Sequence, residues 1–395
     1  MPRQTSSPSP VAPRPALLSN LGSWRARGRM RDDTPGLFDL PTSGRFEPAR
    51  LTQARVRVGM SKTELASEVG VSAAAVGQYE AGVNSPRQDV IARLAKVLSV
   101  RPDFFAVGRP LARLDTVHAH FRGLRSARVS DRQKALATAT LVWELTFALE
   151  RYVKLPDVDL PTVLPSSSPA EAAGLLRQHW HLPDGPVKHL VATTEAHGIV
   201  VALRPLAEID AVDAFSVVIV DRPIIVTTPR RSENVFRHRF SIAHELGHLL
   251  LHADTTEYSA SAEKDADDFA AAFLTPAASM DAALPQRLDL AALDRLGRTW
   301  GVSPHSLILR MVERGRTTES SQRRAFQRLR TVGDPSADPT SAYPGEVPTL
   351  LKKAAELSGQ CGAGVPALAE ALKVSPRAVR DLLGEVDQRP VLRLV

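Results

Sequence analysis

The sequence predicts an α+β fold in which a small central sheet is flanked by all-α regions. Runs of β-branched residues lie between residues 199 and 226, and helical periodicity precedes them and resumes from Phe240 to about Arg330. At 395 residues the chain is too long for one ordinary domain. We therefore expect several domains, each with a core of its own.

The composition narrows the class of protein. With 43% hydrophobic and 24% charged residues, the chain is typical of soluble globular proteins. Its single cysteine, Cys361, excludes a disulfide framework and a cysteine-rich zinc ribbon, and it fits a reducing compartment. No apolar run is long enough to span a membrane, and no secretory signal begins the chain, so we expect a cytoplasmic protein. The net charge of +7 permits an acidic partner such as nucleic acid but does not establish one.

Turn-rich and low-complexity segments divide the chain. The N-terminal segment is rich in Pro, Ser and Arg without apolar periodicity, which predicts disorder, and Pro- and Gly-containing turns cluster near 333–348. The expected organisation is a disordered tail over 1–43, a helix-turn-helix domain over 44–108, a helical linker over 109–160, the domain with the metal motif over 161–280, a helix-turn-helix-like extension over 281–332, a linker over 333–348 and a C-terminal helix-turn-helix-like segment over 349–395.

The individual elements follow from hydrophobic periodicity. Residues 50–105 predict four or five short helices, and residues 132–152 predict one long amphipathic helix with Leu136, Trp143 and Phe147 on one face.

The strands are predicted by β-branched runs between turn residues. One run covers residues 199–203, and two more cover residues 217–220 and 223–226. Because only Asp221 and Arg222 separate the last two runs, they predict a hairpin that turns at these two residues.

A helix-turn-helix pattern occurs three times along the chain. Each copy has a small residue in the middle of a helix, a tight turn, Val-Ser, and an apolar residue four positions after the serine; the copies cover residues 65–72, 296–303 and 368–375. The small residue allows the second helix to cross closely, and the serine can cap that helix. Gly70 and Gly301 tolerate the positive φ of the turn, whereas Lys373 departs from the pattern at this position.

Residues 50–105, which contain the first copy, resemble the Xre/Cro-type DNA-binding domains, and the resemblance implies binding to DNA. Its second helix starts with Ser72, Ala73 and Ala74, so few side chains can read base edges. Gln78 is the main candidate, and the alanine methyl groups could contact thymine. We expect modest sequence specificity, and a helix-turn-helix that docks a protein is the alternative.

Lys62 begins the preceding helix and suits contact with a phosphate. For the second and third copies, packing or docking of a partner is favoured over DNA, because a three-helix core is a common way to close a small domain.

The clearest chemical signal is a His-Glu-x-x-His motif. His244 and His248 are four residues apart, about 40° around a helix, so both imidazoles can bind one ion. Glu245 is placed next to them to activate water and carry its proton. The flanking residues are apolar, which indicates a buried helix in which unpaired histidines would be costly. Gly247 allows another backbone to approach this helix closely.

A second helix is expected to supply the remaining protein ligand. Glu263 and Asp267 are again four residues apart, so one can bind the metal while the other orients a ligand histidine through its free N–H group. Glu263 is the preferred ligand, and His252 or Asp265 in its place are the weaker alternatives. His238 and Tyr258 are candidates to stabilise an oxyanion.

Together these motifs resemble the ImmA/IrrE family of metallopeptidases in its Xre-fused form. The resemblance is carried by the Arg-Phe-x-x-Ala-His-Glu-Leu-Gly-His block, by the block from Glu263 to Pro276 and by residues 213–216, and it covers roughly residues 50–385. It implies a zincin-like minimal peptidase that cuts a repressor or antitoxin-like protein after stress or during induction of a mobile element. The family often has Asn at Asp267 and Met at Thr275; neither difference removes a ligand.

The resulting hypothesis is a zinc endopeptidase that also regulates transcription. Zn²⁺ would be held by His244, His248 and Glu263 in a gluzincin-like site, with Glu245 as the base and Asp267 as support; manganese stays open as the metal. The expected partners are DNA and a protein substrate, itself a helix-turn-helix repressor, and no membrane. The alternatives are a non-proteolytic DNA-binding regulator with a structural or zinc-sensing site, and a docking protein that needs no metal.

Overall fold

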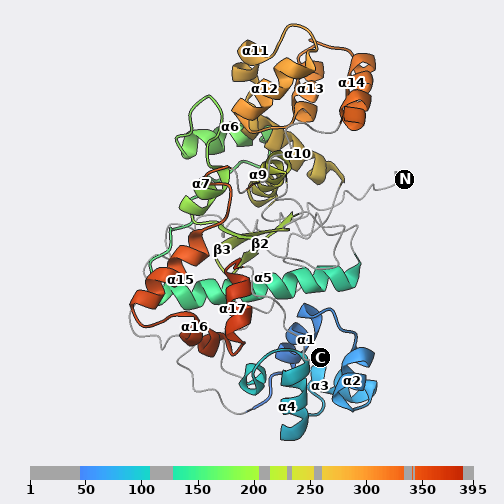
Figure 1. Cartoon of the computed structure of the whole chain (residues 1–395), viewed down its shortest axis with the longest axis vertical. Coiled ribbons are helices and arrows are strands. Elements are labelled where there is room, and N and C mark those ends of the chain that lie inside the picture. Colours follow the sequence, from blue (N-terminus) through green and yellow to red (C-terminus); the bar gives the residue numbers. More distant parts are fainter. Residues whose placement is uncertain are drawn as a thin grey trace, which may run out of the picture. The chain divides into compact units, whose positions relative to one another are not determined.

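A computed structural model describes residues 45–106, 128–203, 214–228, 234–252, 260–332, 340 and 343–385. The tail predicted over 1–43 lies outside these residues. All of the described residues belong to one compact unit, residues 35–395. Helical regions flank a small three-stranded sheet (Figure 1), which confirms the predicted α+β class. Within the described part of the chain, no helix is both long and apolar enough to cross a membrane.

The N-terminal helices confirm the predicted run of short helices. They are α1 (Pro48–Arg57), α2 (Lys62–Val69), α3 (Ala73–Glu80), α4 (Gln88–Val97) and the 3₁₀ helix η1 (Pro102–Phe105). Ser61 caps α2 in a capping box with Glu64, and Gly70 ends α2 in the left-handed region at φ 71°. Ser72 then caps α3 by accepting a hydrogen bond from the backbone N–H of Ala75.

Helix α5 (Val129–Glu150) differs from its prediction in one respect. The sequence predicts an amphipathic helix, but every side chain from Ala135 to Leu149 except Phe147 is buried. The reason is that α5 has partners on all sides: α1, the strands β2 and β3, and the C-terminal helices α15, α16 and α17. A helix that is covered all round needs no polar stripe.

The sheet has the strand order β1-β3-β2, preceded in the chain by α6 (Pro169–His179) and α7 (Leu190–Ala196). The strands are β1 (Val200–Leu203), β2 (Ala214–Ile219) and β3 (Arg222–Thr227). β1 pairs with β3 in parallel, and β2 pairs with β3 in the antiparallel sense.

The hairpin between β2 and β3 is confirmed, but its predicted turn is wrong by one residue. The turn consists of Val220 and Asp221, because Arg222 already pairs with Ile219 in the ladder. The Arg222 guanidinium donates to the carbonyl oxygens of Pro156 (2.8 Å) and Gly198 (2.9 Å). These contacts fix Arg222 in the strand and move the turn back onto Val220, which adopts φ 58°.

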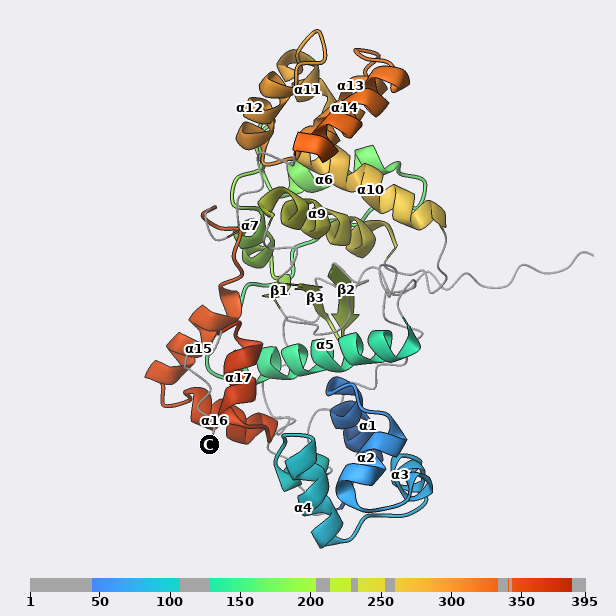
Figure 2. The same ribbon diagram turned by 45° about the vertical axis from the view of Figure 1, so that its right-hand side comes forward.

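Both faces of the sheet are covered, which explains why its strands are continuous apolar runs. Ile224 and Val226 pack in a core with α5, whereas Ile225, which points the other way, packs in a second core with α9 (Val235–Leu251). Figure 2 shows α9 and α5 on opposite sides of the strands.

Helical structure continues after α9, as predicted. The helices are α10 (Ala260–Leu274), α11 (Ala277–Ala283), α12 (Leu290–Trp300), α13 (Pro304–Glu313), α14 (Glu319–Val332), α15 (Leu350–Gln360), α16 (Val365–Leu372) and α17 (Pro376–Leu382).

The segment before α15 packs closely against the helices around the metal motif. The Glu346 carboxylate forms a buried ion pair with Arg239 and accepts a hydrogen bond from the backbone N–H of Leu190 (3.0 Å). His238 Nε2 donates to the backbone oxygen of Glu346 (3.1 Å). Residues 343–348, which fall within the linker expected over 333–348, are therefore attached to α7 and α9.

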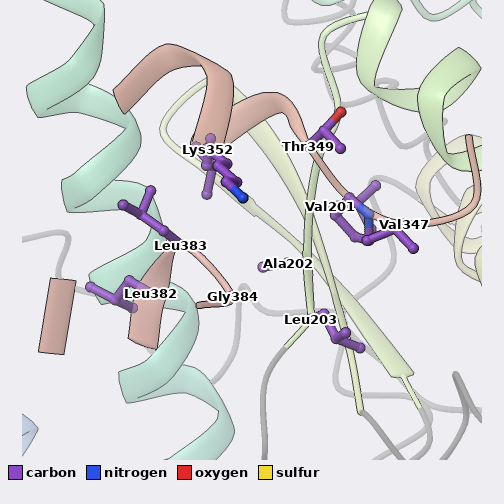
Figure 3. Close-up of a pocket in the computed structure, with 11 residues that line it drawn as sticks. Val201, Ala202, Leu203, Val347, Thr349, Lys352, Leu382, Leu383 and Gly384 are labelled. Carbon is purple, nitrogen blue, oxygen red and sulfur yellow. The ribbon is translucent and has the colours of Figure 1, made fainter. Parts of the chain in front are cut away.

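A small cavity of about 180 Å³ lies where this segment reaches the C-terminal helices (Figure 3). Its walls are mainly apolar and come from β1, from the start of α15 and from the residues at the end of α17. Lys352 is the charged side chain in its lining, and none of the candidate metal ligands contributes to it.

Candidate metal centre

The two helices of the candidate site cross closely, because α9 has a glycine at the crossing. A Cβ atom on Gly247 would lie 3.0 Å from Phe269 Cδ1 and 3.2 Å from the Cα of Ala266 in α10. Ala266 lies between Glu263 and Asp267 in α10, so this contact brings both carboxylates to the histidines of α9.

Three side chains form the donor group that the sequence predicts. The Nε2 atoms of His244 and His248 are 3.0 Å apart. Glu263 Oε2 lies 3.4 Å from His244 Nε2, and Glu263 Oε1 lies 3.7 Å from His248 Nε2. One ligand atom from each residue can be chosen so that the three atoms lie within 4.8 Å of one another. Among the described residues, these three side chains are the set whose spacing suits a shared metal ion.

The outer nitrogen of each histidine has its own partner. Asp267 Oδ1 lies 2.8 Å from His244 Nδ1, and His252 Nδ1 lies 3.3 Å from His248 Nδ1. A carboxylate can only accept, so His244 Nδ1 carries a proton, and Nε2 is the atom through which the neutral ring would bind a metal.

The two alternative ligands lie outside the donor group. His252 contacts His248 through Nδ1, and its Nε2 lies 3.8 Å from Asp265 Oδ2. Neither His252 nor Asp265 belongs to the set of three side chains whose spacing suits a shared metal ion.

The electrostatics of the site favour a positive charge between these donors. Burial lowers the pKa of His244, but the hydrogen bonds to Asp267 and Glu263 and the charge of Glu245 raise it to about 10. Burial raises the pKa of Glu263, but the nearby imidazoles of His244 and His248 hold it at about 2.

The residues fit a divalent cation. Glu263 Oε1 is buried without a hydrogen-bond partner among the described residues, which is a costly state for a carboxylate oxygen. A cation bound by this oxygen and the two Nε2 atoms would satisfy it. Two imidazoles and one carboxylate are a ligand set of catalytic zinc sites, and manganese also accepts nitrogen and oxygen ligands.

Glu245 is buried next to this group and has a partner that the sequence did not indicate as functional. Only 3% of Glu245 is exposed, and its Oε2 accepts a hydrogen bond from the Ser216 hydroxyl over 2.7 Å. Ser216 lies in β2 and is itself buried. The available signal was a single hydroxyl inside an otherwise apolar strand.

Of the two candidate oxyanion residues, His238 is not brought to the donor group. His238 is buried and bonded to Glu346, and Tyr258 lies outside the described residues, as does Asp213 of the motif at 213–216.

The candidate DNA contacts lie on the surface of the first helix-turn-helix. Ser72, Ala73, Ala74 and Gln78 are exposed on or beside α3. Gln78 Oε1 accepts a hydrogen bond from Asn84 Nδ2 (2.8 Å).

Lys62 begins α2, with 49% of its side chain exposed and its Nζ 3.3 Å from Glu80 Oε2. This contact leaves the ammonium group accessible at the surface.

Known protein families match both the first helix-turn-helix region and the region that contains the donor group. Residues 51–105 match the helix-turn-helix family model, and residues 194–311 match a peptidase-family model described as the IrrE N-terminal-like domain. A search of curated proteins found no match. The second match covers α9 and α10, which carry the donor group. The chain therefore joins a helix-turn-helix domain to an IrrE N-terminal-like domain, the fusion that its sequence motifs predict.

Proposed function

We propose that this chain is a cytoplasmic, DNA-binding transcriptional regulator with zinc-dependent endopeptidase activity, which cleaves a partner repressor or antitoxin-like protein in a stress response. The observation that carries the proposal is the donor group of His244, His248 and Glu263, with Glu245 directly after His244 in α9. A structural metal site has no use for such a base and usually has four protein ligands.

The roles of the side chains follow from their contacts. His244, His248 and Glu263 would hold Zn²⁺, with manganese as the alternative, and the ion would supply a Lewis acid for a peptide carbonyl and for water. Glu245 would accept one proton from the attacking water and deliver it to the amide nitrogen that leaves, so that hydroxide is added to the carbonyl carbon as the C–N bond breaks. Asp267 fixes the tautomer of His244.

The helix-turn-helix over residues 51–105 would bring this activity to DNA. In this proposal Lys62 contacts a phosphate, and Gln78 reads a base edge from α3. Ala73 and Ala74 offer methyl groups to thymine, and Ser72 fixes the start of the reading helix. The substrate would be a regulator of the same helix-turn-helix class.

A comparison of new protein N-termini in cells tests this function. Cells would produce either the wild-type chain or Glu245→Gln, which retains the shape of the side chain but removes the base. We expect one regulator to gain a cut with the wild-type chain alone. Identical profiles under several stresses, including DNA damage, would count against the peptidase.

One observation favours the non-proteolytic alternative. Only 3% of Glu245 is exposed, which leaves it little contact with an attacking water. A zinc-sensing regulator would change its affinity for DNA with zinc and would do so equally in the wild-type chain and in Glu245→Gln. Measuring DNA affinity at defined zinc concentrations with both proteins separates the two functions.

A further inference from the structure

The third copy of the repeated pattern folds into a complete helix-turn-helix turn. The residue at the turn is left-handed in all three copies, with φ of 71° at Gly70, 67° at Gly301 and 56° at Lys373. In the third copy the N–H of Val374 donates to the oxygen of Ala369 over 3.1 Å, and Ser375 caps α17 by accepting from the backbone N–H of Ala378.

The same bonds occur in the first copy, where Val71 donates to Ala66 over 3.0 Å and Ser72 caps α3. The substitution of lysine for glycine therefore leaves the turn geometry of the third copy intact.

The copies differ in what their second helix exposes. In a helix-turn-helix, residues near the start of this helix face the DNA bases. The second and fifth residues after the capping serine are Ala74 and Gly77 in the first copy, which offer no long side chain. In the third copy they are Arg377 and Arg380, and both are exposed.

The second copy provides an internal contrast. Its corresponding residues are His305 and Ile308 of α13. The His305 ring stacks on Phe326 of α14 at a centroid distance of 3.9 Å, and Ile308 is fully buried. In the second copy, therefore, one of these two residues stacks on a following helix and the other is buried, whereas in the third copy both are exposed.

The two arginines are accessible for a ligand. Among the described residues, Arg377 has no hydrogen bond or ion pair. Arg380 is 46% exposed, and its Nε lies 4.0 Å from Glu385, which is longer than a hydrogen bond.

Of the neighbouring acids, Glu370 is paired with two basic side chains outside the arginine pair, which weakens its repulsion of an anionic ligand. Glu370 pairs with Arg101 (2.5 Å) and Lys373 (2.6 Å).

We propose that the C-terminal helices α15, α16 and α17 form a second DNA-binding head, in which Arg377 and Arg380 contact duplex DNA. Two guanidinium groups at the start of a recognition helix suit guanine edges and phosphates, the groups that arginine recognises most often in DNA. The sequence alone favoured packing or docking of a partner for this copy; the two exposed arginines of α17 now favour DNA.

The structure also connects this head to the first helix-turn-helix. The backbone N–H of Arg101 donates to the Lys373 oxygen over 3.0 Å, and Val100 forms an isolated antiparallel bridge with Val374. Two heads on one chain strengthen each other by effective concentration when both engage the same duplex. We therefore expect the selected DNA site to contain two separate sequence elements.

The test uses the full chain and a pool of duplex DNA with randomised sequence. Wild type, Arg377→Ala/Arg380→Ala and the control Arg287→Ala/Arg295→Ala, which removes two other exposed arginines, would each select DNA from the pool. Affinity for the wild-type site would then be measured by fluorescence anisotropy over a range of salt concentrations. We expect the α17 variant to bind roughly 10- to 100-fold more weakly, with a smaller salt dependence, and to lose one element of the selected site. The control should bind as wild type does.

A lysine variant separates recognition of the base sequence from the electrostatic attraction to DNA. Arg377→Lys/Arg380→Lys should restore the salt dependence without restoring the lost sequence element, because lysine cannot form the bidentate contact. Unchanged affinity and an unchanged selected site in the α17 alanine variant would overturn the proposal. So would a defect confined to binding of a protein partner. Thermal unfolding of each variant shows whether α17 remains folded. If the alanine variant unfolds at a lower temperature than wild type, the test rests on the lysine variant, which should lose one sequence element from the selected DNA site.

Discussion

The Ser216 hydroxyl and the Glu245 carboxylate form a buried hydrogen bond of 2.7 Å between β2 and α9. It connects the edge strand of the sheet to the side chain that the proposed reaction uses as its base. In the absence of this bond, the carboxylate would have more freedom to rotate. We therefore assign Ser216 a positioning role towards Glu245.

Replacing this hydroxyl should lower the rate of the proposed hydrolysis. A hydrogen bond to a charged group contributes about 1.5–3 kcal/mol, so Ser216→Ala should reduce kcat roughly 10- to 100-fold. Bound zinc should be unchanged, because Ser216 is not a member of the donor group. Ser216→Thr keeps the hydroxyl and should recover most of the rate. Equal kcat in Ser216→Ala and wild type would show that the bond has no positioning role.

Removal of the Asp267 carboxylate should weaken metal binding. It lies 2.8 Å from His244 Nδ1, and loss of such an outer partner typically costs 10- to 100-fold in metal affinity. Asp267→Ala should show this loss in a competition titration with a chelator, whereas Asp267→Asn should retain more affinity because an amide oxygen accepts the same hydrogen bond. The matched control is Asp268→Ala, since Asp268 is exposed and pairs with Lys264. A similar loss in the Asp268 control would exclude a specific role for Asp267.

The close crossing of α9 and α10 should not tolerate a side chain at Gly247. An added methyl group would contact Phe269 and the backbone of Ala266, so Gly247→Ala should lower the free energy of unfolding by roughly 1–3 kcal/mol. Gly174 in α6 is the control, because nothing lies within 4 Å of a Cβ added there. Gly174→Ala should raise stability by about 0.5–1 kcal/mol in the same denaturant titration. Equal changes in the free energy of unfolding for the two variants would contradict a close crossing of α9 and α10 at Gly247.

Much of this arrangement could be predicted from the sequence, because it depends on local spacing. The four-residue intervals in α9 and α10 place side chains on one face of a helix wherever that helix lies. Likewise, each Val-Ser turn identifies a helix-turn-helix without knowledge of its neighbours.

The remainder depends on contacts between distant residues. Arg239 pairs with Glu346, 107 positions further along the chain, and no local pattern indicates this partner. The parallel pairing of β1 with β3 is equally non-local. The burial of α5 on every side also required knowledge of its partners, since the sequence resembles that of a one-sided helix.

Acid should loosen the contact between α9 and the segment at Glu346. Burial, together with the nearby charge of Arg239, lowers the pKa of His238 to about 4. The hydrogen bond to Glu346 opposes this shift in part. A group with a lowered pKa stabilises the fold above its unfolded value of 6.5, and this contribution is lost as the pH falls from 6.5 through 4. The total is about 3 kcal/mol.

His238→Gln removes the titrating group and keeps a donor, so its stability should vary less with pH over this range. The control is His189→Asn, because His189 also contacts the segment, through the Pro344 oxygen, but is exposed. Asparagine tolerates the left-handed backbone at this position, φ 54°. Denaturant titrations at pH 4 to 7 compare the proteins, and an identical pH dependence in His238→Gln and wild type would refute the assignment.

The most direct test of the central claim is cleavage by the purified, zinc-loaded chain in water labelled with ¹⁸O. The substrate would be the regulator that gains a new N-terminus in cells. The account predicts that wild type cuts one peptide bond and that the new C-terminus takes up one labelled oxygen. Glu245→Gln with the same bound zinc should be at least about 100-fold slower, the scale of general acid–base catalysis. Equal cleavage by both proteins, or none by either with zinc bound, would contradict the account and leave a metal-binding regulator of DNA.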